Sequence, residues 1–208
     1  MGNNIGTYAI SKMGIASMAM NTPNINEATL RLTIKRLKEL PVNPAFPLTT
    51  SRADYDNVIK SITTFEDPDV EIFNALFELF DVKGDESILY RDLIAGIVGC
   101  LIVGSLEKKL LLAFELYDVR GKNDLNRADL KKILHSINNT ASYFGDNVLE
   151  KLAVDELVSD IFYSVSVANV TDEASLVNID MGQCAEYLSA HESVQAFANS
   201  QGTKVFGE

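Results

Sequence analysis

The stretch that decides the fold is Phe77-Glu78-Leu79-Phe80-Asp81-Val82-Lys83-Gly84. It recurs almost unchanged 37 residues later as Phe114-Glu115-Leu116-Tyr117-Asp118-Val119-Arg120-Gly121. In both copies an aromatic-rich segment with helical spacing runs into a loop that begins with an aspartate. A self-match at a fixed period indicates that one structural unit is repeated along the chain. The unit predicted here is a helix, a loop and a second helix.

The length of the loop and the placement of its aspartates are typical of the EF-hand. A 12-residue EF-hand loop carries oxygen ligands at positions 1, 3, 5 and 12 and a glycine at position 6. In the loop that starts at Asp81, position 3 is Lys83, position 6 is Glu86 and position 12 is Asp92. Asp85 supplies position 5, so Asp81, Asp85 and Asp92 are the candidates for a weak divalent-ion site, which suits magnesium at least as well as calcium.

The loop that starts at Asp118 is less suited to a metal ion. Arg120 stands at position 3, Lys122 at position 5 and Asp129 at position 12. Two like unit charges about 4 Å apart repel by roughly 4 kcal/mol at an effective dielectric constant near 20. We therefore expect these loops to be turns that keep the fold, with no resident metal.

Further units are expected before and after this repeat. The first loop is framed from Pro41 to Arg52 and the fourth from Asp172 to Gln183, and neither frame contains a set of metal ligands. Position 8 of each loop forms a short β pairing with its neighbour, because one unit alone leaves backbone groups open. The frames predict two pairs of apolar, branched residues: Leu48 with Ile88, and Leu125 with Ile179.

The sequence therefore predicts an all-α fold of four EF-hand-like helix–loop–helix units in two paired lobes, with very short β pairings between loops. We expect a flexible N-terminal arm at residues 1–24, an N-terminal EF-hand pair at 25–100, a C-terminal pair at 101–192 and a tail at 193–208.

Composition and charge exclude several classes of function. Apolar residues make up 47% of the 208 residues, which is enough for a core, and the net charge of −11 argues against nucleic acid as a partner. Cys100 and Cys184 stand far apart, as expected for reduced thiols in a cytoplasmic protein. The sequence has no nucleophile–base pair, no phosphate-binding glycine loop and no paired acid/base spacing. We expect no catalysis and no cofactor.

Gly2 is a candidate for N-myristoylation. The pattern for this modification requires Gly2 and usually has serine or threonine at position 6, where this chain has Gly6. The alternative is a plain flexible start. Contact with a membrane is expected only if Gly2 is acylated.

The chain resembles the neuronal calcium sensor, calcineurin B and calaxin branch of EF-hand proteins over about residues 25–200. The residues that carry the resemblance are Phe77 to Asp81, the Gly2 start, and Gly104-Ser105-Leu106-Glu107-Lys108-Lys109 followed by Ala113 to Asp118. The Gly-Ser-Leu-Glu-Lys-Lys sequence is most similar to calaxin, a ciliary dynein-associated protein. The resemblance implies a non-enzymatic protein whose lobes expose an apolar groove for an amphipathic helix of a partner. The chain departs from this branch at its calcium ligands.

The candidates for such a groove lie on the exit helix of the second unit, which has more apolar surface than one helix face usually needs. They are Leu93, Ile94, Ile97, Val98, Leu101, Ile102 and Val103. The alternative is that these residues form plain core within a lobe.

Two hypotheses for function stay open at this point. The first is a calcium-independent adaptor or structural subunit that binds an amphipathic helix in the cytoplasm. Its candidate setting is a ciliary or flagellar, cytoskeletal or motor assembly. The second is a calcium- or magnesium-responsive regulatory sensor with N-terminal acylation.

Overall fold

The computed structural model describes residues 24–40, 49–102, 104–118, 121–143, 149–168, 177–192 and 194–195. Gly2, nearly all of the expected arm and most of the expected tail lie outside these residues. Within them the chain forms eight helices and four strands of three residues each. The prediction of an all-α fold with very short β pairings between loops is confirmed.

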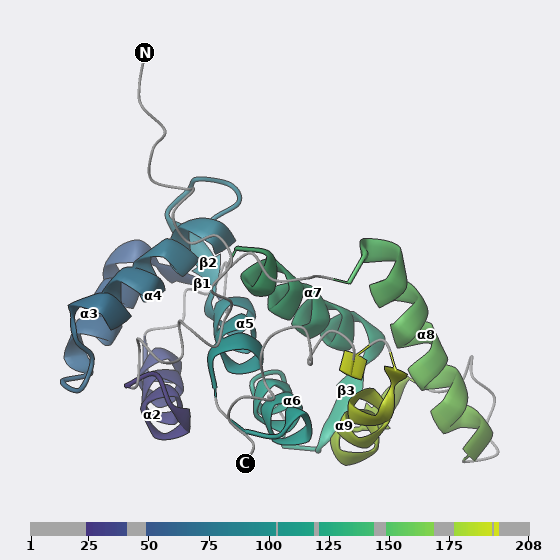
Figure 1. Ribbon diagram of the computed structural model, residues 1–208. Helices are drawn as coiled ribbons and strands as arrows, with labels where there is room; N and C mark the ends of the chain where they lie inside the picture. Colours follow the sequence, from purple (N-terminus) through teal and green to yellow (C-terminus); the bar gives the residue numbers. More distant parts are fainter. Residues whose placement is uncertain are drawn as a thin grey trace.

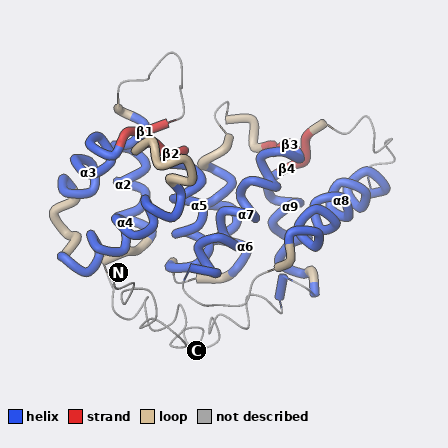
Figure 2. Tube along the Cα trace, turned by 90° about the horizontal axis from the view of Figure 1, so that it is seen from above, coloured by secondary structure: helices blue, strands red, loops and turns tan. Residues whose placement is uncertain are grey.

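The helices follow one another as four helix–loop–helix units in two pairs (Figure 1). The N-terminal pair consists of α2 (Glu27–Lys38), β1 (Thr49–Ser51), α3 (Arg52–Ser61), α4 (Asp67–Phe80), β2 (Ser87–Leu89) and α5 (Tyr90–Leu101). The C-terminal pair consists of α6 (Leu106–Glu115), β3 (Asp124–Asn126), α7 (Arg127–Tyr143), α8 (Lys151–Ala168), β4 (Asn178–Asp180) and α9 (Met181–Ala190). Figure 2 shows both β pairings on the same side of the molecule.

The β pairings confirm one predicted residue pair and correct the other. Strands β3 and β4 are antiparallel and place Leu125 opposite Ile179, as predicted. Strands β1 and β2 are also antiparallel, but Thr50 lies opposite Ile88, so the predicted pair of Leu48 with Ile88 is wrong. The first loop is therefore framed two residues later, from Asn43 to Asp54, and the frame from Pro41 to Arg52 is wrong as well.

Two local features explain this shift of register. The side chain of Ser51 accepts a hydrogen bond from the backbone N–H of Asp54 (3.2 Å), which caps α3 and fixes its start at Arg52. The predicted frame also placed Pro47 inside the strand, where proline has no N–H to donate to the ladder. The strand begins after this proline instead, and Leu48 lies outside the described residues.

The two pairs meet where α5 crosses α7, and two glycines permit the close approach. A Cβ atom added to Gly96 would lie 2.0 Å from Oγ1 of Thr140, and one added to Gly99 would lie 2.6 Å from Cγ1 of Ile137. Neither position has room for a side chain. The buried residues of both pairs belong to a single hydrophobic core.

We expect Gly96→Ala to lower the free energy of unfolding by about 1–3 kcal/mol, because the added methyl group overpacks the crossing of α5 and α7. At an open helical site the same change stabilises by up to about 1 kcal/mol, so the sign of the effect is diagnostic. Urea denaturation followed by circular dichroism measures the change. A Gly96→Ala protein as stable as the native chain would contradict the close crossing.

Candidate functional site

The loop between α4 and α5 closes on the carboxylate of Asp81. The backbone N–H of Asp85 donates to Oδ1 of Asp81 (3.1 Å), and the backbone N–H of Glu86 donates to Oδ2 (3.0 Å). Glu86 has a φ of 55°, so position 6 adopts the left-handed conformation that glycine adopts freely. Both oxygens of the first candidate ligand are engaged by the backbone of their own loop.

The loop between α6 and α7 closes in the same way on Asp118. Its Oδ1 accepts from the backbone N–H of Lys122 (2.9 Å), and its Oδ2 accepts from the backbone N–H of Asn123 (2.7 Å). Arg120 lies outside the described residues, while the side chains of Lys83 and Lys122 are exposed. Because these two cations extend into water, solvent screens their repulsion of an ion, and the penalty is smaller than expected from the sequence.

Asp92, the third candidate ligand, is held by the neighbouring unit. It is half-buried at the start of α5 and accepts a hydrogen bond from the hydroxyl of Tyr117. Burial raises the pKa of the Asp92 carboxyl and of the Tyr117 hydroxyl. Among the described residues no group of three or more His, Cys, Asp and Glu side chains is placed to hold a metal ion. Asp81, Asp85 and Asp92 are therefore not brought together as one such group in this arrangement.

The residues expected to line a docking groove lie in the core of this structure. Their exposed fractions are between 0% and 6% for Ile94, Ile97, Val98, Leu101 and Ile102. Leu93 is also fully buried, and Val103 lies outside the described residues. Helices α6 and α7 both pack against α5. These residues are therefore core in this structure, which is the alternative to a docking groove. A partner would reach them only if α5 separated from α7.

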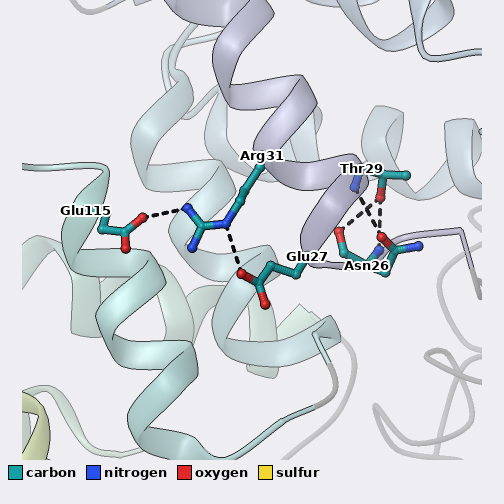
Figure 3. A network of polar contacts seen from close by, with 5 residues as sticks. All are labelled: Asn26, Glu27, Thr29, Arg31 and Glu115. Carbon is teal, nitrogen blue, oxygen red and sulfur yellow. Dashed lines mark hydrogen bonds and ion pairs between the residues drawn. The ribbon is translucent and has the colours of Figure 1, made fainter.

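A surface that was not predicted from the sequence is a groove between α2 and α6, with a volume of about 380 Å³. Beside it, Nη1 of Arg31 lies 2.8 Å from Oε2 of Glu115, and Nε of Arg31 lies 2.9 Å from Oε1 of Glu27 (Figure 3). Hydrogen bonding to Glu115 and Glu27 raises the pKa of Arg31. The α2–α6 groove is defined by a floor and a charged rim. The floor is Ile34, Leu112 and Leu116, and the rim is Arg31, Lys35, Lys38, Glu39 and Glu115.

The sequence contains one signal for this groove, which is the spacing of the three rim cations at i, i+4 and i+7 along α2. That α6 lies beside α2 is not visible in the sequence. Arg31 and Glu115 are 84 residues apart along the chain.

We expect Tyr117→Phe to lower the free energy of unfolding by about 1.5–3 kcal/mol, because it leaves the half-buried Asp92 carboxylate without its charged hydrogen bond. Tyr90→Phe is the matched control, since Tyr90 is 7% exposed and its hydroxyl has no hydrogen-bond partner among the described residues. Urea denaturation of Tyr117→Phe, of Asp92→Asn and of the double variant measures the coupling energy between the two side chains. The same measurement on Tyr90→Phe gives the control. Additive effects of Tyr117→Phe and Asp92→Asn would contradict the contact.

We expect Ile97→Asp to unfold the protein, because an unpaired carboxylate in the core costs several kcal/mol against a total stability of about 5–15 kcal/mol. Val167→Asp, on the exposed side of α8 (59% exposed), should keep its helical circular dichroism spectrum. A helical, soluble Ile97→Asp protein that fails to bind its partner would instead favour an open groove on α5.

No helix of the described residues is long and apolar enough to cross a membrane. No family model matches the chain. It is 25% identical over 138 residues to calcium-binding protein NCSA of Dictyostelium discoideum, and the match covers 66% of this chain and 68% of that protein. The resemblance to the neuronal calcium sensor branch of the EF-hand proteins is thereby supported as a distant homology to a calcium-binding protein.

Proposed function

We propose that the protein is a non-enzymatic, EF-hand-like adaptor that binds a helical segment of a partner protein and does so without calcium. The observation that carries the proposal is the engagement of the candidate ligands. Asp81 and Asp118 each accept two backbone N–H groups, and Asp92 accepts the hydroxyl of Tyr117. Loops closed in this way keep their turns without an ion, so the fold is prepared for a partner at any calcium concentration.

The setting proposed for this adaptor is a larger cytoplasmic assembly. The resemblance of Gly104-Ser105-Leu106-Glu107-Lys108-Lys109 to calaxin points to a ciliary, flagellar or other cytoskeletal or motor complex. A constitutive subunit suits such a complex, because it is held in place by its partner at all times.

A second candidate function is a regulatory sensor that responds to calcium or magnesium and is acylated at Gly2. The homology to calcium-binding protein NCSA favours it. In that function Asp81 would bind the ion through the lone pairs that its backbone hydrogen bonds leave open, and Asp92 would leave Tyr117 to complete the site. Divalent-ion binding thus separates the two candidates.

We expect isothermal titration of the full chain with calcium to find no site tighter than about 10⁻⁴ M, the weak end of natural EF-hands. Thermal melts in EDTA and in millimolar calcium should then overlay within about 2 °C, because a ligand that binds the folded state raises its melting temperature. A micromolar site, or a large shift of the melt with calcium, would refute the metal-independent adaptor and support the sensor.

A matched variant shows whether the residues of the second loop account for the expected absence of tight calcium binding. Lys83→Asp, Glu86→Gly and Asp92→Glu together restore positions 3, 6 and 12 of the EF-hand loop. This triple variant should bind calcium at least about tenfold more tightly than the native chain. If it does not, the loop chemistry is not what prevents calcium binding.

A further inference from the structure

The floor of the α2–α6 groove is apolar and recessed. Ile34 from α2 is 9% exposed, while Leu112 and Leu116 from the α6 side are 4% and 2% exposed. A flat surface does not reach residues that lie this deep between two helices. These residues line a groove of about 380 Å³, so an apolar side chain that projects from a peptide would enter that space.

The helix that supplies the cations of the rim, α2, is basic although the chain as a whole is acidic. Helix α2 contains four arginines and lysines and one glutamate, whereas the whole chain has a net charge of −11. Arg31 is neutralised by two carboxylates (Figure 3). Lys35 meets Glu39 at 4.0 Å, with both side chains more than half exposed, and Lys38 forms no ion pair with another described residue. Lys35 and Lys38 are therefore the cations available to an anionic ligand.

Because an apolar floor lies beside two available lysines, we propose that the α2–α6 groove binds an acidic, amphipathic helical segment of a partner protein. The proposal rests on the proposed function, because it names where the adaptor holds its partner and what that partner carries. An apolar residue of the segment fills the floor, and a carboxylate about one helical turn away meets Lys35 or Lys38. The pairing of unlike charges sets the orientation of the segment and speeds its association.

A lipid bilayer fits this groove less well than a peptide. Glu39 and Glu115 also line the groove, and they repel a densely anionic membrane surface. A peptide avoids this repulsion, because its single carboxylates can be placed beside the lysines and away from the two glutamates. The floor is also too recessed for lipid headgroups to cover it.

The test uses the full chain and two labelled helical peptides with leucines at i, i+4 and i+7. One peptide carries glutamates beside the leucines and the other carries lysines. Fluorescence anisotropy should show the glutamate peptide binding at least about tenfold more tightly than the lysine peptide. Lys35→Glu/Lys38→Glu should lower the affinity for the glutamate peptide at least about tenfold. Lys60→Glu/Lys83→Glu makes an equal charge change outside the groove lining and should leave this affinity within about twofold.

Equal affinity for both peptides, or equal losses in both double variants, would overturn the proposal. Vesicles of phosphatidylserine that bind the chain through Lys35 and Lys38, while the glutamate peptide does not bind, would overturn it in favour of a membrane surface. The peptide titrations are run in EDTA and in millimolar calcium. If the glutamate peptide binds tightly only with calcium, the metal-independent function is refuted and the groove proposal stands. If it binds in neither buffer, the groove proposal is refuted, and the metal-independent function is tested by the calcium titration alone.

Discussion

The crossing of α5 and α7 is the constraint on which the rest of the structure depends. Gly96 and Gly99 have no side chains, so the two helices approach closely enough for Thr140 and Ile137 to occupy the space that other residues would need. The apolar face of α5 is covered by this crossing, and a surplus of apolar residues on one helix becomes the shared core of both pairs. The crossing also holds the pairs side by side, so that α2 comes to lie next to α6 and Asp92 next to Tyr117.

The second and third loops each contain hydrogen bonds that help to set their shape. Glu86 and Asn123 are left-handed, a conformation that costs roughly 1–2 kcal/mol for most residues and less for asparagine. Two backbone N–H groups donate to the aspartate at the head of each of these loops, and hydrogen bonds to a charged acceptor are among the stronger ones. These bonds offset the strain within the loop itself.

The helix–loop–helix units and one of the β pairings depend on local interactions, and the sequence predicted both. The repeat that begins at Phe77 predicted the helix–loop–helix units, and position 8 of the loop frames predicted the pairing of Leu125 with Ile179. The first pairing was wrong because an apolar residue, Leu48, was preferred at position 8, although the cap at Ser51 fixes Thr50 there. The cap is also a local signal, and it indicates the observed register, whereas the apolar residue at position 48 does not.

What the sequence could not predict depends on contacts between distant residues. The core role of Ile97 follows from the packing of α7 on α5, and periodicity alone cannot distinguish a helix face that is covered by its own chain from one that is left for a partner. The α2–α6 groove depends likewise on two helices that are far apart along the chain, and it becomes visible when Arg31 and Glu115 are seen to meet. Tyr117 and Asp92 are also on different units.

This geometry gives the aspartates at position 1 of the second and third loops a structural role. In a calcium-binding EF-hand the residue at position 1 is a metal ligand, and finding Asp81 and Asp118 in the sequence therefore suggests metal binding. Here each carboxylate accepts the N–H groups of positions 5 and 6, which is a task that the fold requires whether or not an ion is bound. Distant homology to a calcium-binding protein and a loop that begins with aspartate are thus both compatible with a chain that has kept the turn. The side chains at positions 3 and 12 of the second loop do not accept these N–H groups, so Lys83 and Asp92 say more about calcium than the aspartate that opens the loop.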